Sequence, residues 1–331
     1  MKDSPSRINV LRARMGGLFA VLALLLPATG CRKALPDIAV IPRTTATLLW
    51  EPMHLGVAEA ARQAGLHLYW NAPADEGDAE KQISLFDACR QAGYRGFIFA
   101  PIETLAARTV VLETVAHRKP VVVVDDEFGP APGPYLSYVE NDEAIGANLA
   151  AAHIAALLPR GGSIAIVGIN TRLESGVSRE EQFEKALARR APGVRILVRR
   201  FGDPVVTHQQ QIAAQILHGP KHIDALIAMT ATATRGAFYA KISSEPHSAI
   251  PLVGFDQEML LPIQTGDVDA VVMQDTRQIG ALALRNLNAM LRGEQAPGLT
   301  LVAPLLVTRA TLNQPAVARQ WVFADYDWSQ Q

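Results

Sequence analysis

The fold of this chain is decided by the stretch Ile250-Pro-Leu-Val-Gly-Phe-Asp-Gln257. Its apolar middle has the length and composition of a buried parallel strand, and it ends in Phe255 and Asp256. Ligands bind at the carboxyl edge of open α/β sheets. An aromatic ring beside a carboxylate suits a small polyol, because the ring covers C–H groups while the carboxylate accepts hydrogen bonds from neighbouring hydroxyls. This stretch alone leaves open a core phenylalanine with a helix-capping aspartate.

The same alternation of short apolar runs and longer polar segments repeats through the chain from residue 38 onward. Strands are predicted at residues 38–41, 66–70, 96–100, 121–125, 136–139, 163–168, 194–201, 225–229, 252–255 and 270–274. Helices are predicted at residues 51–64, 79–92, 104–118, 142–158, 177–191, 206–218, 232–243, 257–265 and 276–292. Strand, helix and strand at a spacing of about 30 residues predict a parallel, doubly wound sheet.

Length and composition restrict the class of protein. The 331 residues suggest two domains, and 49% hydrophobic residues supply two cores. With 31 basic against 32 acidic side chains, the chain lacks the basic surplus of a nucleic-acid binder. Only Cys31 and Cys89 are present, which excludes a disulfide framework and a four-cysteine zinc site. We expect Cys89 to be a small buried hydrophobe, and we expect no metal and no cofactor.

The amino terminus has the pattern of a secretory signal. Basic residues between Lys2 and Arg14 precede a charge-free run of 16 residues from Met15 to Gly30, shorter than a membrane span requires. The run ends in Pro27-Ala-Thr-Gly-Cys31, which resembles the lipobox cleaved by the lipoprotein signal peptidase. The resemblance implies that a lipid-modified Cys31 begins the mature chain. A plain signal peptide with an incidental cysteine and an uncleaved anchor are the alternatives.

Polar residues recur where the predicted strands end. Trp50 offers a stacking platform, Asp125 an acceptor for two sugar hydroxyls, Arg179 a cation at a helix start, and Gln274 a polar end to a buried run. Each has a structural alternative: core or rim packing for the tryptophan, a turn or cap for the aspartate, and a solvated surface position for the arginine. Together they predict a cleft built for hydrogen bonding.

Several short motifs occur in a fixed order along the chain. They are Gly56-Val-Ala-Glu-Ala-Ala-Arg-Gln-Ala-Gly65, Gly96-Phe-Ile-Phe-Ala-Pro101, Pro120-Val-Val-Val-Val-Asp125, Asn141-Asp-Glu-Ala-Ile-Gly146, Ser178-Arg-Glu-Glu-Gln-Phe183, Val253-Gly-Phe-Asp256, Gln274 with Gln278-Ile-Gly280, and Leu306-Val-Thr308. In this order, over residues 38–313, they resemble the periplasmic sugar-binding proteins of ATP-binding-cassette (ABC) importers, of the ribose-binding type. The family shares its fold with the effector domains of lactose-repressor-type regulators.

The resemblance implies an α/β fold of two doubly wound parallel-sheet lobes joined by three crossing segments, near residues 141, 275 and 300. Ligand would bind between the lobes and favour a closed form by a hinge motion. The implied division is residues 1–30 as lipoprotein signal peptide, 31–37 as tether, 38–141 with 276–300 as amino-terminal lobe, 142–275 with 301–313 as carboxyl-terminal lobe, and 314–331 as tail.

The resemblance also implies which residues bind the ligand. Those that match the family pattern, or stand at its ligand positions, are Thr47, Trp50, Asp125, Asp126, Arg179, Thr230, Phe255, Asp256 and Gln274. This chain departs from the ribose binders at several of the family's ligand positions. Leu49 stands where the family has a second stacking aromatic, so only Trp50 keeps that role, and the other replacements are Thr47 and Ala100 for asparagines, Asp126 for an arginine, and Thr230-Ala231 for an Asn-Asp pair. The three carboxylates Asp125, Asp126 and Asp256, facing the single Arg179, would make the cleft more acidic than a ribose site. This favours an amino-bearing sugar or another cationic compound.

The function implied is that of a lipid-anchored, periplasmic solute-binding protein that delivers a sugar or related polyol to an ABC permease in the inner membrane. We expect a monomer, because receptors of this type work singly. We expect no catalytic activity, because the sequence lacks a phosphate-binding Gly-rich loop and a nucleophile elbow. Gly219-Pro220 would break the helix that a metal site at His218 and His222 needs. A signal or chemosensory receptor of the same fold is the alternative. A transcriptional regulator of this fold would need a helix-turn-helix where the signal segment stands. An enzyme using Asp125 and Asp126 as acid and base is disfavoured, because adjacent residues at a strand end point in different directions.

Overall fold

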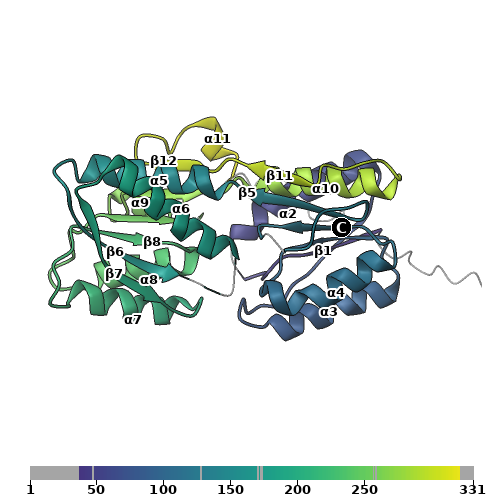
Figure 1. The fold of residues 1–331 in the computed structure, drawn as a ribbon, viewed down its shortest axis with the longest axis horizontal. Coiled ribbons are helices and arrows are strands. Elements are labelled where there is room, and N and C mark those ends of the chain that lie inside the picture. Colours follow the sequence, from purple (N-terminus) through teal and green to yellow (C-terminus); the bar gives the residue numbers. More distant parts are fainter. Residues whose placement is uncertain are drawn as a thin grey trace, which may run out of the picture. The chain divides into compact units, whose positions relative to one another are not determined.

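The computed structural model describes residues 37–46, 48–126, 129–169, 171, 174–255, 257 and 259–320. The signal segment with Cys31, the ligand-site candidates Thr47 and Asp256, and the tail after Gln320 lie outside the described residues. Within that part of the chain, the main strands form two six-stranded sheets interleaved with helices (Figure 1). None of the helices in the described part of the chain combines the length and the hydropathy of a membrane span.

The first sheet has the strand order β11-β5-β4-β3-β1-β2, and every neighbouring pair is parallel. Its strands are β1 (Ile38–Ile41), β2 (Leu68–Trp70), β3 (Gly96–Phe99), β4 (Val121–Val124), β5 (Leu136–Asn141) and β11 (Leu299–Val302). Its helices are η2 (Leu48–Trp50), α2 (Glu51–Ala64), α3 (Ala79–Ala92), α4 (Thr104–Ala116) and α10 (Thr276–Leu291). Because side chains alternate along a strand, one face packs against α2 and α10 and the other against α3 and α4.

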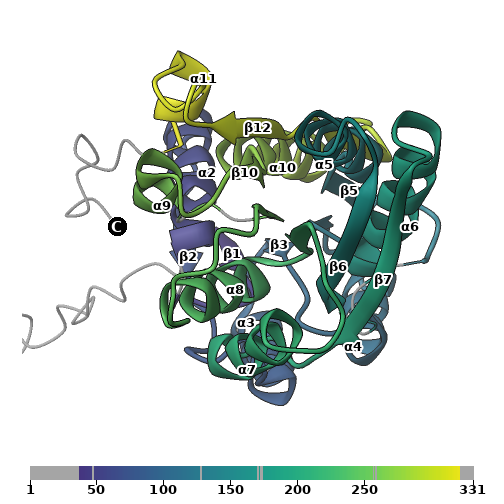
Figure 2. The same cartoon turned by 90° about the vertical axis from the view of Figure 1, so that its left-hand side faces the viewer.

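The second sheet has the order β12-β10-β9-β8-β6-β7. Its strands are β6 (Gly162–Ile169), β7 (Val194–Phe201), β8 (Ala225–Ala228), β9 (Leu252–Phe255), β10 (Ala270–Met273) and β12 (Leu305–Thr308). Its helices are α5 (Glu143–Leu157), α6 (Glu174–Arg190), α7 (Val206–Leu217), α8 (Ala231–Ile242), α9 (Leu260–Thr265) and α11 (Pro315–Ala318). Figure 2 shows α5 and α6 on one side of this sheet and α7 and α8 on the other, which the two core clusters also show.

Three short segments connect the two sheets. The chain leaves the first sheet after Asn141, returns between Met273 and Thr276, and leaves again between Val302 and Leu305. The third crossing lies a few residues beyond the predicted position, because β11 continues to Val302 beside β5. Strand β12 then runs antiparallel to β10, so the second sheet is mixed at this edge. The structure confirms the predicted class of two α/β lobes.

Most predicted elements are confirmed within three residues of their ends. Helices α2 and α3 and strands β1, β7 and β9 have the predicted bounds. Cys89 is buried in the core between α3, α4 and the first sheet, and burial raises the pKa of its thiol to about 11. The predicted helix at 257–265 begins only at Leu260. The edge strands β11 and β12 and the short helix α11 were not predicted.

Helices α2 and α10 approach each other through two glycines. A Cβ atom added at Gly56 would lie 2.0 Å from the backbone oxygen of Arg277, and one added at Gly280 would lie 2.4 Å from the backbone oxygen of Met53. Both contacts involve backbone, which cannot rotate away as a side chain can. The first lobe therefore depends on close packing of two helix backbones.

We expect Gly56→Ala to lower the free energy of unfolding by about 1 to 3 kcal/mol, because the methyl group forces α2 and α10 apart. The sign of this change is informative, because alanine in a helix interior otherwise stabilises a protein by about 1 kcal/mol relative to glycine. Urea unfolding measures the change. Gly133→Ala is the matched control, because an added Cβ there meets no atom within 4 Å. A stabilised Gly56→Ala variant would contradict the packing described above.

Candidate ligand-binding site

A buried arginine joins the two aspartates that follow β4. Arg43 lies just beyond the carboxyl end of β1, and its Nη1 donates to Asp125 Oδ2 at 2.7 Å while its Nη2 donates to Asp126. Its Nε donates to the backbone oxygen of Pro101 at 2.9 Å. Burial disfavours the charged guanidinium, but Asp126 and Asp125 outweigh burial and raise the pKa of Arg43. Arg43 therefore stays charged and fixes both carboxylates.

Asp125 has two features that a purely structural ion pair does not need. Its backbone φ is +67°, a left-handed conformation that costs a residue with a Cβ roughly 1–2 kcal/mol. Its Oδ2 binds Arg43, whereas its Oδ1 is buried and accepts no hydrogen bond from the described residues. A buried carboxylate oxygen without a donor is costly. The strained backbone and the unpaired oxygen together mark Asp125 as the centre of the candidate site.

Trp50 lies beside this cluster but is only 2% exposed. Its ring belongs to the core between α2, α10 and the first sheet, and the Arg43 guanidinium lies 5.6 Å from the ring centroid. Its indole Nε1 is buried and finds no acceptor among the described residues. The structure thus gives the ring the core-packing role that was the alternative at this position. Stacking of Trp50 on a ligand stays a prediction.

Arg179, on α6 in the second lobe, is held by a carboxylate that the sequence reasoning missed. Its Nε and Nη2 donate to the two carboxylate oxygens of Glu143, each at 2.7 Å, and its Nη1 donates to the backbone oxygen of Met229 at 2.7 Å. Its guanidinium carbon lies 4.7 Å from the ring centroid of Phe255. These bonds use three of the five N–H groups, so one on each Nη can serve another acceptor.

Charged residues of both lobes affect the pKa of Arg179. Burial opposes its charge, but Glu143 outweighs burial and raises the pKa, with a further contribution from Asp125 and an opposing one from Arg43. The charges at the carboxyl ends of β1 and β4 in the first lobe therefore act on an arginine of the second lobe. Such coupling fits a single site built from residues of both lobes.

The remaining described candidates lie at strand ends of the second lobe. Thr230 caps α8 through a bond from the Ala233 N–H to its Oγ1 at 3.2 Å, so its hydroxyl oxygen is partly occupied. Gln274 is half-buried just after β10, and its backbone oxygen accepts from the Gln257 side chain at 2.9 Å. Gln257 also donates to Thr276 at 3.1 Å within the second crossing. Both candidates lie at strand ends, as the sequence predicted.

The described residues add two charged partners, Arg43 and Glu143, that the prediction did not include. Three carboxylates were expected to face Arg179 alone, but Arg43 holds Asp125 and Asp126, and Glu143 holds Arg179. Glu76, in the loop before α3, is a further acid whose pKa is raised by burial, against the attraction of Arg43 and Arg235. Each described carboxylate thus has a cationic neighbour. Two of the three expected carboxylates are thus held by Arg43, and the third, Asp256, lies outside the described residues.

A family model described as "Periplasmic binding protein domain" matches residues 38–295. The D-allose-binding periplasmic protein of Escherichia coli (strain K12) is 25% identical over 292 residues, which cover 83% of this chain and 93% of that protein.

Solved structures share the two-lobe fold. An ABC transporter solute binding protein from Agrobacterium vitis, bound with α-D-tagatopyranose, superposes with a TM-score of 0.78 at 20% identity. The match covers 85% of this chain and 97% of that protein. A second solute binding protein, from Actinobacillus succinogenes with bound D-allose, has a TM-score of 0.75 at 18% identity. The match covers 83% of this chain and 98% of that protein. At these identities the likeness shows the fold.

Proposed function

Because this chain belongs to the periplasmic binding protein family, we propose that it captures a small neutral sugar between its two lobes and delivers it to an ABC permease in the inner membrane. The observation that carries the proposal is the unpaired Oδ1 of Asp125, buried beside the Arg43 guanidinium. A sugar hydroxyl would satisfy it. The relatives of this chain are transport binding proteins rather than enzymes, in agreement with the prediction that the chain is not an enzyme.

The donors and acceptors of the site favour a polyol. Asp125 offers an acceptor, Arg179 offers N–H groups, and the Trp50 indole N–H is without an acceptor among the described residues. A hydroxyl group can donate to the first and accept from the others, whereas an ammonium group can only donate. Arg43 and Arg179 together face three carboxylates, so these pairs leave one negative charge in excess. The choice of a neutral hexose or pentose over an amino sugar therefore rests on its hydroxyls, which can both donate and accept.

The proposed location is the periplasmic side of a membrane. The family is extracytoplasmic, and the lipobox-like sequence before Cys31 supports attachment through a lipid on that residue. The tether from residue 32 to residue 37 would then join the anchor to β1. Mass spectrometry of the mature amino terminus tests this part of the proposal: a diacylglycerol adduct on Cys31 supports it, and an unmodified terminus at another residue contradicts it.

The ligand test is a thermal unfolding series of the form that starts after Cys31, against pentoses, hexoses, amino sugars, other polyols and small amines. A ligand at 100 times its dissociation constant adds about 2.7 kcal/mol, enough to raise the melting temperature by several degrees. We expect a shift with a neutral hexose or pentose. A shift with amines alone would overturn the neutral-sugar assignment. No shift with any compound would contradict transport and favour a receptor that presents a surface to a membrane sensor.

A further inference from the structure

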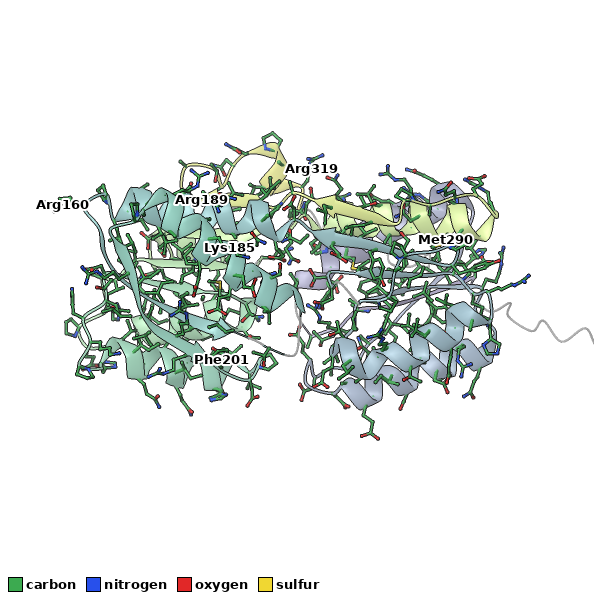
Figure 3. The ribbon with its side chains drawn as sticks, viewed as in Figure 1. Arg160, Lys185, Arg189, Phe201, Met290 and Arg319 are labelled. Atoms are coloured by element: carbon green, nitrogen blue, oxygen red, sulfur yellow. The ribbon has the colours of Figure 1, made fainter. Side chains whose placement is uncertain are left out.

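The segment after β12 does not end in the lobe to which β12 belongs. Residues 309–320, which include α11, run on from β12 and reach the beginning of α10. Both views show α11 next to β12, and Figure 3 labels Arg319 at the same place. We call residues 309–320 the hinge strap. Three sets of contacts fix it, one in each lobe and one at a crossing.

The first anchor lies in the second lobe. Val317 is 1% exposed and belongs to the hydrophobic core that α7, α8 and α9 form with the second sheet. Leu312 packs against the same core. The start of the strap is also bonded to β12, because the N–H groups of Thr311 and Leu312 both donate to the Thr308 oxygen at 3.0 Å. The strap therefore moves with the second lobe.

The second anchor is on the first lobe. Nη1 of Arg277, in the first turn of α10, donates to the backbone oxygen of Arg319 at 3.2 Å. Nη2 of the same guanidinium pairs with Glu59 of α2, so the arginine is itself held within the first lobe. The strap backbone is thus bonded to the first lobe through Arg277, a residue of α10.

The third anchor is the second crossing itself. Gln320 is 2% exposed, and its Nε2 donates to Asp275 Oδ1 at 2.7 Å. The same Oδ1 accepts from the Gln278 N–H at 2.9 Å and so caps α10. Asp275 therefore has one oxygen that fixes both the start of a first-lobe helix and the end of the strap.

We propose that the hinge strap restrains rotation of the lobes about the crossing at Asp275. Hinge closure concentrates its change of backbone angles in a few residues of the connecting segments. Because Val317 is fixed in one lobe and Arg277 in the other, a rotation must stretch or break the bonds of the strap. The covalent crossings alone would leave that rotation freer. This restraint goes beyond the proposed function, since it acts whether or not a ligand is present.

The test measures lobe movement in the ligand-free protein, purified as the cell matures it. Dyes on Gln91→Cys in α3 and Gln215→Cys in α7 report the distance between lobes by single-molecule energy transfer. Both positions are exposed, whereas Cys89 is buried and its raised pKa of about 11 keeps it unreactive. In Gln320→Leu with Arg277→Met, we expect the population outside the main peak to rise about five- to thirty-fold, the effect of losing 1 to 2 kcal/mol.

Glu59→Ala is the matched control, because it removes the first-lobe partner of Arg277 but leaves its N–H groups for Arg319. Its energy-transfer distribution should coincide with that of the unmodified protein. The single variant Gln320→Leu keeps the side-chain volume and replaces the double variant if circular dichroism shows that the double variant is unfolded. An unchanged distribution in Gln320→Leu and in the double variant overturns the proposal. Equal broadening in Glu59→Ala also overturns it, because general loosening of the first lobe would then be the cause.

Discussion

Replacing Arg43 by methionine is expected to lower the free energy of unfolding by about 3 to 5 kcal/mol, the usual cost of removing one partner from a buried ion pair. Asp125 and Asp126 are 5% and 0% exposed, and both lose the guanidinium that binds them. Methionine fills the space of the arginine stem, so the loss measures the charge and its hydrogen bonds. Urea unfolding followed by circular dichroism gives the value.

Arg277→Met is the control for this prediction, because the Arg277–Glu59 pair is about a third exposed and such pairs contribute roughly 0–1 kcal/mol. The loss of unfolding free energy in Arg43→Lys should lie between those of Arg43→Met and Arg277→Met. The lysine ammonium keeps the charge but lacks the planar guanidinium that reaches three acceptors at once. If Arg43→Met and Arg277→Met lower the free energy of unfolding equally, Arg43 does not bind the two aspartates in solution as it does in the structure.

The fold was largely predictable because its signals are local. Helices α2 and α3 end where Gly65 and Gly93 adopt left-handed backbone angles, with φ of +68° and +100°. Buried strands such as β4 are four valines in a row. The two missed strands lie at sheet edges and have four residues each; both are largely apolar, but Leu299 and Leu301 of β11 are about half exposed. Such strands form through their neighbours, which the local sequence does not reveal.

The positions of the candidate residues at the strand ends were predictable, but their partners were not. Parallel strands bring their carboxyl ends to one edge, so Asp125 and Asp126 were expected there. That Arg43 binds them depends on the order β4-β3-β1, which joins residues 82 and 83 positions apart. Glu143 is an acid in the first turn of α5, which favours a helix-dipole role, and only the packing of α5 against α6 brings it to Arg179.

Two residues show that one side chain can serve a local role at a predicted ligand position. Thr230 follows β8 as predicted, but it caps α8, which any threonine before a helix tends to do. Trp50 precedes α2 as predicted, yet its ring fills the core. The sequence pattern identifies the position of such residues. Burial of the ring and occupation of the hydroxyl are results of packing, which the pattern does not contain.

Asp125→Asn is expected to weaken binding of the sugar found in the thermal series about a hundredfold. Losing one member of a buried charged hydrogen bond costs about 2 to 5 kcal/mol, and each 1.4 kcal/mol is tenfold in affinity. The unpaired Oδ1 is the atom that we expect to accept from the ligand. Asparagine tolerates the positive φ at this position and keeps an oxygen for Arg43, so the folded state should survive the change. Isothermal titration calorimetry measures the affinity.

Asp87→Asn is the matched control, because Asp87 pairs with Arg90 on α3 and has no part in the proposed site. It should leave the affinity unchanged. Unfolding curves of both variants separate a lost contact from a lost fold: we expect Asp125→Asn to bind poorly at nearly full stability, because the oxygen that faces Arg43 is retained. Binding within threefold of the unmodified protein would place the sugar elsewhere, and the strain at Asp125 would then need another cause.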